Sequence, residues 1–413
     1  MGSFSIPLSG LSASQDQLQS VSNNLANIDT DGYKDQNLTF GDVFSQSTRT
    51  NGAGNPLQTG YGVGVSSTVS DFSEGSLNPT GSSSNMAISG NGFFVTQSPT
   101  GTPDYTRTGD FTTNKAGQLT TPNGELLLGY PAVGGVVNTA GTLQPLQVGT
   151  GVTIPAVAST TIGITANLDS TTAIGGTSSS SVAVFDSLGA VHDLTVTYTK
   201  TASNTWTYAV TVPSADITGA TGATTPVGSG TLNFDTSGTL ASTTGVVPIT
   251  IPTLSDGAAS PLNLTGPFGS ATSPTITQTA LADATSAATT DGFASGTLST
   301  FTVQPDGTIE GTFSSGNTLA LGQVAVASFA NTQGLANTGN NNYQPTAASG
   351  AAVIGVAGTG GRGTVAGGYV EASNVNIATE FAKLIVAQQA YSANAKSITT
   401  FNQVSQATIA MLQ

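Results

Sequence analysis

The sequence contains no cysteine, which excludes disulfide bonds and thiolate metal sites. Charged side chains make up only 7% of the 413 residues, and the formal net charge is −14. The 8 lysines and arginines are too few and too scattered to form a basic patch that neutralises phosphates, so no nucleic-acid partner is expected. The only histidine, His192, rules out a metal site built from several histidines.

Long hydrophobic runs are also missing. No stretch of about eighteen apolar residues occurs, so we expect no membrane insertion. The first positive side chain is Lys34, and polar residues interrupt every apolar run before it, so we expect no cleaved secretory signal. Glycine is abundant, and serine and threonine occur throughout, as in extracellular β-rich proteins. An extracellular composition without the usual export signal is a mismatch that the function has to explain.

The two ends of the chain have the periodicity of amphipathic helices, predicted over 4–28 and 377–412. Each carries a narrow apolar stripe in an alternating four-three register, which is typical of coiled-coil packing. The predicted interface residues are Leu8, Leu11, Leu18, Val21, Leu25, Ile28, Ile377, Phe381, Leu384, Tyr391, Ile398, Ile409 and Leu412. An isolated pair of such helices is marginal in water, so we expect them to order fully when many copies pack together. The alternative is an ordinary core helix packed on a β body.

The middle of the chain has the pattern of short strands separated by turns. Val182, Val184, Leu194, Val196 and Tyr198 alternate with polar residues, and Trp206 opens a returning strand. Asn91-Gly92 and Asn123-Gly124 are typical of β-hairpin turns.

We expect a mainly β, multidomain fold with paired, coiled-coil-like terminal helices. Its domains are nested, with an outer β domain inserted into an inner β domain. A helical polymerisation domain is predicted over 1–30 with 371–413, and a connector with a β-hairpin over 31–80. The inner domain is predicted over 81–146 with 289–370, and the outer domain over 147–288.

Motifs that could carry chemistry are weak. Residues 358–363 match G-x-G-x-x-G, but no helix pattern follows to receive a pyrophosphate, so we predict a loop. Residues 29–32 resemble a calcium loop, but the glycine comes too early and no glutamate follows in register. His192 falls on a strand, where we expect an edge or surface position. We therefore predict no catalytic residue, no metal site, no cofactor and no enzyme activity.

The two ends together resemble the signatures of the bacterial flagellar rod and hook proteins. The N-terminal match runs from Ser9 to Lys34, and the C-terminal match lies between Glu371 and Tyr391. The motif residues are Asn23, Asn24, Asn27, Thr30, Gly32, Tyr33, Ser373, Asn374 and Gln388. Gln389 departs from the family, which often has arginine at that position. Residues 185–200 with Trp206 resemble the outer domain of the hook members, which shorter rod subunits lack.

The resemblance implies a structural subunit of the flagellar hook that polymerises with itself into a flexible helical tube, a universal joint between motor rod and filament. It implies as partners the flagellar rod, the hook cap, the hook-filament junction proteins and the flagellar type III export apparatus. The implied location is extracellular, in the hook and basal body, after export without a cleaved signal. The alternatives are a distal rod or hook-associated junction protein, or a secreted β-rich adhesin.

Overall fold

The computed structural model describes residues 4–43, 45–50, 56–149, 151–245, 248–270 and 273–411. The chain divides into two compact units. The terminal unit comprises Met1–Gly149, Phe301–Gly311 and Leu319–Gln413, and the inserted unit comprises Thr150–Thr300 and Thr312–Thr318. Both ends of the chain therefore belong to one unit, and the other unit is formed mostly by one continuous segment.

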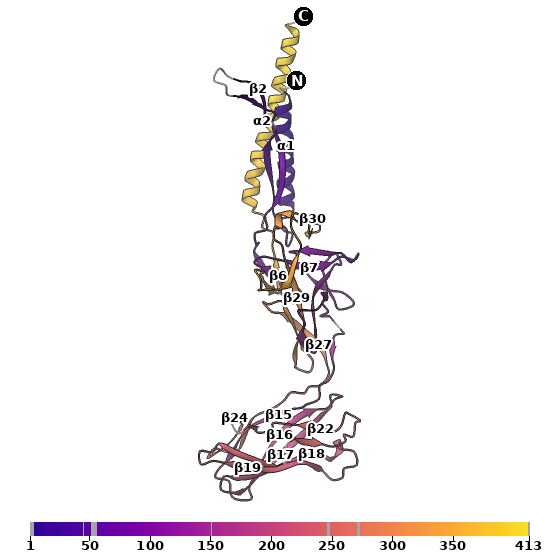
Figure 1. The fold of residues 1–413 in the computed structure, drawn as a ribbon, viewed down its shortest axis with the longest axis vertical. Helices are drawn as coiled ribbons and strands as arrows, with labels where there is room; N and C mark the ends of the chain where they lie inside the picture. The colour runs from indigo at the N-terminus through magenta and orange to yellow at the C-terminus, as the bar shows by residue number, and fades with distance from the viewer. Residues whose placement is uncertain are drawn as a thin grey trace. The chain divides into compact units, whose positions relative to one another are not determined.

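Two long helices dominate the terminal unit: α1 (Ser5–Ala26) and α2 (Ile377–Ala410), which lie side by side (Figure 1). Pro7 stands in the first turn of α1, where its missing N–H costs no helical hydrogen bond. The side chain of Asn376 caps α2 by accepting a hydrogen bond from the Thr379 amide at 3.1 Å. No helix of the described segments is long and apolar enough to cross a membrane.

A ribbon of strands connects the helices to the β body of the terminal unit. β1 (Gln36–Asp42) pairs antiparallel with β4 (Val63–Ser70) and packs along α1. β2 (Ser45–Thr50) pairs with β3 (Pro56–Gly60), and β5 (Leu77–Pro79) pairs with β34 (Tyr369–Glu371). The segment that precedes α2 is thus hydrogen-bonded to the segment that follows α1.

The body contains a sheet whose central part has the order β29-β11-β7-β8-β31-β30. Phe94 on β7 packs in one apolar cluster, and its neighbours Phe93 and Val95 pack in a second one, so this strand is buried on both faces. The bounds are β7 (Phe93–Gln97), β8 (Pro103–Thr106), β9 (Thr112–Thr113), β10 (Leu119–Thr120), β11 (Leu126–Val133), β12 (Val136–Val137), β13 (Gln144–Pro145), β28 (Thr308–Phe313), β29 (Thr318–Ser328), β30 (Ala336–Gly339), β31 (Asn342–Gln344) and β32 (Val353–Val356).

The hairpin predicted at Asn91-Gly92 is wrong. β6 (Met86–Ser89) pairs with β33 (Thr364–Gly367), whereas β7 pairs with β8, β11 and β29. Gly92 has φ +135°, and an added Cβ there would meet the Val326 side chain at 2.5 Å, so close packing of the backbone requires this glycine. The Asn123-Gly124 turn does join two paired strands, β10 and β11.

The inserted unit has a five-stranded sheet in the order β16-β17-β18-β19-β20 and a three-stranded sheet in the order β25-β15-β26. Trp206, Tyr198 and Val184 are fully buried in the core that these strands share, as their alternation predicts. The bounds are β14 (Thr153–Ile154), β15 (Ile162–Asp169), β16 (Thr177–Phe185), β17 (Val191–Ala202), β18 (Thr205–Pro213), β19 (Thr224–Phe234), β20 (Leu240–Gly245), β21 (Ile249–Ile251), β22 (Leu262–Leu264), β23 (Gly269–Ser270), β24 (Ser273–Pro274), β25 (Ile276–Thr279), β26 (Ala284–Thr290) and β27 (Gly296–Val303).

The expectation for His192 is also wrong. It lies on β17, which has a neighbour on either side, and only 5% of its surface is exposed. Residues 358–363 form the expected loop, with the Gly358 amide bonded to the Gly363 carbonyl at 2.9 Å.

Candidate functional site: the paired chain ends

The C-terminal end of α1 meets the N-terminal end of α2 in a buried polar cluster. Asn24 is 1% exposed, and its amide nitrogen donates to Asp35 Oδ1, to the Gln36 carbonyl at 3.0 Å and to Glu380 Oε2 at 3.1 Å. Its amide oxygen accepts from Tyr33 Oη at 3.0 Å and from the Gln36 amide at 3.1 Å. Because each polar atom of this side chain is used, Asn24 ties both helices to the segment that leaves α1.

A second buried group holds the segment before α2. Glu371 is fully buried, and its Oε1 accepts from Lys34 Nζ at 2.6 Å and from the Gly75 amide at 3.0 Å. Arg107 Nε lies 2.8 Å from Glu371 Oε2, an ion pair whose geometry is poorly aligned for a hydrogen bond. Two cations on one buried carboxylate offset the cost of removing its charge from water.

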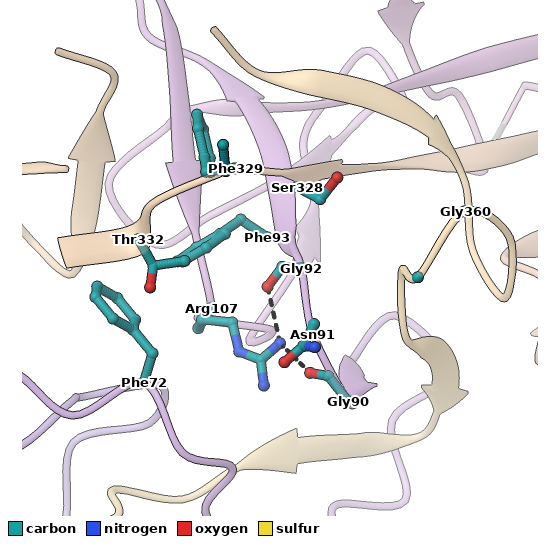
Figure 2. A pocket seen from close by; sticks show the side chains of 12 residues that line it. Phe72, Gly90, Asn91, Gly92, Phe93, Arg107, Ser328, Phe329, Thr332 and Gly360 are labelled. Atoms are coloured by element: carbon teal, nitrogen blue, oxygen red, sulfur yellow. Dashed lines mark hydrogen bonds between the residues drawn. The ribbon is translucent and has the colours of Figure 1, made fainter. Parts of the chain in front are cut away.

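Arg107 links this cluster to the β body. Its Nη1 donates to the Gly90 and Gly92 carbonyls at 2.9 and 2.8 Å, and Figure 2 shows the side chain bordering a surface cavity beside Phe72 and Phe93. The guanidinium is only 3% exposed. With its donors directed at the protein's own carbonyls and at Glu371, Arg107 is a structural tie rather than a free anion site.

The motif residues after α1 and before α2 interlock. Asn374 Oδ1 accepts from the Asp35 amide at 2.8 Å, and its Nδ2 donates to the Asp71 carbonyl at 2.8 Å. Gly32 has φ +71°, its amide bonds to the Glu371 carbonyl at 2.7 Å, and a Cβ there would lie 2.6 Å from the Thr108 amide nitrogen. Any other residue would push these segments apart, which explains the glycine of the motif.

Burial and charge shift the titration of the same groups. Burial, with Asp35 and Glu380 nearby, raises the pKa of Tyr33 to about 12. Burial lowers the pKa of Lys34 although Glu371 acts in the opposite direction, and burial raises the pKa of Asp35. Dehydrated charges of this kind stabilise a structure only while every partner is in place, so the cluster is sensitive to single substitutions.

The other motif residues occupy local turns or the surface. Asn23 donates to Tyr33 Oη at 3.1 Å, Thr30 donates to Asn27 Oδ1 at 3.2 Å, and Asn27 Nδ2 donates to the Asn23 carbonyl at 2.8 Å. Ser373 Oγ accepts from the Val375 amide at 3.4 Å. Gln388 is exposed on α2.

The two helices pack through small and polar side chains. Ala387 is 0% exposed, a Cβ on Gly10 would lie 2.8 Å from the side chain of Asn394, and the Phe4 and Phe401 rings lie 6.0 Å apart. The row of α2 that faces α1 is therefore Glu380, Ala387, Asn394 and Phe401, with Leu384 and Ile398 half-buried beside it. The predicted four-three register includes Leu384 and Ile398, but it places its other row one residue later than the observed one, at Phe381, Gln388 and Ala395. The small side chains occupy the contact with α1 because they allow the helix axes to approach closely.

Large apolar side chains of both helices remain exposed. Leu8 is 58% exposed and Ile377 is 52% exposed. Of the predicted interface residues, Val21 is buried, Leu11, Leu18, Leu25, Ile28, Leu384 and Ile398 are half-buried, Leu8, Ile377, Phe381, Tyr391 and Ile409 are exposed, and Leu412 lies outside the described residues. Ile6, Ile385, Val386, Phe401, Val404 and Met411 are also exposed. The apolar surface is therefore broader than the predicted stripe.

The periodicity of the helices located the exposed apolar surface but missed the polar cluster. Lys34, Arg107 and Glu371 come from segments far apart in sequence. Nothing in the sequence around any one of them distinguishes it from a charged residue exposed to solvent. The signal available in the sequence was the scarcity of basic residues, because a chain with only 8 lysines and arginines has few of them for its solvent-exposed surface.

The fold and the cluster define a structural protein that joins its two ends in one unit and presents apolar helix surfaces. Comparison of the sequence with protein families shows which structural proteins the chain is similar to. Residues 6–34 match the flagella basal body rod protein family, and residues 366–411 match the flagellar basal body rod FlgEFG protein C-terminal family. Residues 87–167 match the flagellar hook protein FlgE/F/G D1 domain, and residues 157–293 match the flagellar basal body protein FlaE D2 domain.

Relatives match along nearly the whole chain. The flagellar hook protein FlgE of Escherichia coli (strain K12) is 34% identical over 418 residues, covering 97% of this chain and 98% of that protein. The flagellar hook protein FlgE of Borreliella burgdorferi is 32% identical over 439 residues, covering 97% of each. A crystal structure of Helicobacter pylori flagellar hook protein FlgE2 superposes with a TM-score of 0.53 at 16% identity, over 71% of this chain and 100% of that one, and shows the same fold.

The chain belongs to the flagellar hook protein family. It is a structural subunit of the bacterial flagellum, located in the hook and basal body, and the adhesin and junction-protein alternatives are not favoured.

Proposed function

We propose that this chain polymerises through the exposed apolar surfaces of α1 and α2 into a flexible helical tube, the universal joint between motor rod and filament. The observation that carries the proposal is the exposure of large apolar side chains on a helix pair already packed on its other face. Full burial of each such side chain is favourable by about 1.5–3 kcal/mol, so a few contacts per copy suffice for assembly.

The tethering of the helix pair supports this assignment. Asn24, Glu371 and Asn374 bond segments from both ends of the chain to each other and to the β body. A force transmitted through the helices of one copy therefore reaches its β strands through buried hydrogen bonds and ion pairs. A torque-carrying subunit needs such a connection.

The remaining partners follow from the same role. We propose that the rod, the hook cap and the hook-filament junction proteins meet the tube at its ends, and that the flagellar type III export apparatus delivers the chain unfolded. The absence of cysteine suits this route, because no disulfide has to form after export. The four predicted parts, with boundaries near residues 30, 80, 146, 288 and 370, remain our proposed division of the tube's layers.

Ile385→Asp tests the polymerisation surface. Ile385 is 56% exposed in the single subunit, so a charge there leaves the fold and melting temperature unchanged but is strongly disfavoured in an apolar contact between copies. We expect the critical concentration for tube formation, measured by sedimentation and electron microscopy, to rise at least about tenfold, since tenfold corresponds to only 1.4 kcal/mol.

The control is Asn123→Asp, which adds a negative charge at an exposed turn between β10 and β11, away from both helix surfaces. Tubes that form at the wild-type concentration with Ile385→Asp would contradict the proposal. The half-buried Leu25 and Leu384 make less selective sites, because Leu25→Asp and Leu384→Asp also disturb the pairing of α1 with α2 in the single subunit.

A further inference from the structure

Four carboxylate and imidazole side chains of the inserted unit converge at one end of its five-stranded sheet. Asp186 follows β16, His192 stands at the start of β17, Asp216 lies in the short 3-10 helix Ser214–Asp216, and Asp256 lies in the loop between β21 and β22. We propose that Asp186, His192 and Asp256 bind a divalent transition-metal ion such as Zn²⁺. The site goes beyond the structural role of the chain and does not depend on it.

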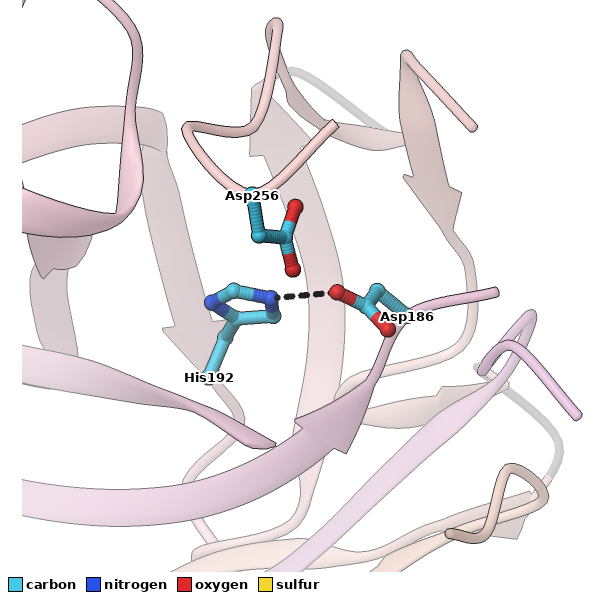
Figure 3. A group of neighbouring side chains, drawn as sticks. All are labelled: Asp186, His192 and Asp256. Atoms are coloured by element: carbon cyan, nitrogen blue, oxygen red, sulfur yellow. Dashed lines mark hydrogen bonds and ion pairs between the residues drawn. The ribbon is translucent and has the colours of Figure 1, made fainter. Parts of the chain in front are cut away.

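The ligand atoms are close enough for one ion. His192 Nε2 lies 3.1 Å from Asp186 Oδ2, and the ligand atoms of Asp186, His192 and Asp256 all lie within 4.8 Å of one another. With metal–ligand bonds of about 2.0–2.2 Å, two ligands of a tetrahedral zinc stand roughly 3.3 Å apart. Figure 3 shows the Asp256 carboxylate directed toward the His192–Asp186 pair.

Asp216 completes the arrangement from the other side of the ring. Its Oδ2 lies 3.1 Å from His192 Nδ1, within ion-pair distance but, as for Arg107 Nε, not aligned for a hydrogen bond. A carboxylate at Nδ1 holds the ring proton there and leaves the Nε2 lone pair free for a metal, as in carboxylate–histidine–zinc triads. Each ring nitrogen therefore has a carboxylate oxygen 3.1 Å away, and we assign Asp216 the role of a positioning residue.

The backbone fixes the carboxylates in advance. Asp186 Oδ1 accepts from the Leu188 and Ala190 amides at 2.8 and 2.9 Å, which leaves Oδ2 for a ligand. Asp256 accepts from the Ala258 amide at 3.0 Å with one oxygen. The Asp256 loop is attached to the turn after β16, where the Ala259 amide donates to Ser187 Oγ at 2.8 Å.

The charge of the site also calls for a cation. Asp186 and His192 are buried, Asp256 is exposed, and three carboxylates surround a single imidazole. Between residues 116 and 361 the sequence has one lysine and no arginine, and this Lys200 donates to the Ser170 carbonyl and lies over the Trp206 ring. Among the described residues of the inserted unit, no lysine or arginine pairs with the cluster. The exposed position of Asp256 gives an ion a path from solvent.

The donor set indicates which ions bind. An imidazole nitrogen with two carboxylates favours zinc and its first-row neighbours, whereas calcium and magnesium prefer oxygen ligands alone. We therefore expect a 1:1 complex with Zn²⁺, and no competition from millimolar Mg²⁺ or Ca²⁺. An ion joining β16, β17 and the Asp256 loop stabilises the inserted unit against unfolding.

The test uses the untagged full-length chain, so that His192 is its only histidine. Isothermal titration with ZnCl₂ should give one site, and the melting temperature of the inserted unit should rise by about 5 °C at roughly 100 times the dissociation constant. NMR of the single ¹⁵N-labelled imidazole should show the Nε2 signal shifting while Nδ1 stays protonated. The same titration without any heat, melting shift or imidazole shift would overturn the proposal.

Variants separate the site from adventitious binding. Asp256→Asn, on an exposed loop, should abolish the Zn²⁺ complex while the folded chain is retained, and Asp216→Asn should weaken it by about 10–100-fold. The matched control is Asp193→Asn, since Asp193 is exposed on the opposite face of β17. Equal Zn²⁺ affinity in Asp256→Asn and Asp193→Asn would show that the ion binds elsewhere and would refute the assignment.

Discussion

At the scale of single residues, the terminal unit depends on a few side chains whose partners come from distant segments. Asn24 and Glu371 are the clearest cases, because both are buried and each bonds a group on the other side of the inserted unit in sequence. Replacing one partner in such a network leaves the others dehydrated and unpaired, which costs more than the loss of one hydrogen bond.

Asn24→Asp tests this network with almost no change of shape. A carboxylate cannot donate to Asp35, Gln36 and Glu380, and it places a third negative charge beside two others. We expect the free energy of unfolding of the terminal unit to fall by about 3 kcal/mol, measured by urea denaturation. The control is Gln19→Glu, which adds a carboxylate at an exposed position of α1 outside the cluster. Equal losses in the two variants would show that the buried cluster does not stabilise the chain ends.

The pH dependence of the inserted unit has a clear contributor in Asp291. Burial would raise its pKa, but hydrogen bonds from the side chain and amide of Thr160 and from the Thr161 amide lower it to about 2. A depressed folded-state pKa adds stability that is complete above the unfolded value near 3.8 and is lost as pH falls through about 2.

Asp291→Asn should therefore destabilise the inserted unit by about 1 kcal/mol at pH 7 and leave it equal to wild type near pH 2. Thermal unfolding followed between those pH values checks this convergence. If the stability difference between Asp291→Asn and wild type stayed the same at pH 2, these hydrogen bonds would not be stabilising the charged form of Asp291, and the prediction would be wrong.

At the scale of elements, the helices show how much of the structure the hydrophobic periodicity of the sequence predicts. The pattern predicted 377–412, and α2 runs over Ile377–Ala410, since nothing in that stretch breaks a helix and Asn376 caps its start. One row of the predicted seam was displaced by one residue, because a hydrophobicity pattern assumes that large apolar side chains face the partner helix. Here the small Ala387 and the polar Asn394 face α1, and the larger Phe381 and Ile385 are exposed.

Ala387→Leu and Gln388→Leu distinguish the two registers. Ala387 has no exposed surface, so the larger side chain forces the helices apart and should cost about 1–3 kcal/mol. Gln388 is exposed, and its substitution should leave the pairing of α1 with α2 intact. Amide hydrogen exchange of α1 measures both effects. Faster exchange in Gln388→Leu than in Ala387→Leu would restore the register predicted from the pattern.

The strands illustrate a different limit. Alternation located the buried residues of β16, β17 and β18, because each strand has one face toward the core. The side-chain cluster around His192 was not predicted because Asp216 lies in a short 3-10 helix and Asp256 lies in a loop, and neither position follows the period of a strand. The pairing of β6 with β33 was not predicted because at least 275 residues separate the paired residues, such as Ser89 and Thr364.

At the scale of the whole molecule, the insertion of one unit into the other separates two tasks. The terminal unit carries both chain ends and the exposed apolar helices, and the inserted unit has its own core. We infer that the terminal unit determines assembly and that the inserted unit tunes how the tube bends.

Removing the inserted unit tests this division. Ile154 pairs with Gly296 in an antiparallel ladder, so deleting 155–295 and joining the two residues through Asn-Gly closes the chain with a β-hairpin turn. We expect tubes that still assemble but have altered curvature and supercoil under electron microscopy. Loss of all assembly in a terminal unit that remains folded would contradict the division.

The central claim is that the outward apolar side chains of α1 and α2 are the contacts between copies of this chain. A helical reconstruction of the assembled tube by electron cryomicroscopy tests it most directly. Our account predicts that Ile377, Phe381 and Ile385, exposed in the single subunit, are buried against helices of neighbouring copies around a central channel. A tube in which these side chains stay in solvent, with the β strands making the contacts between copies, would contradict it.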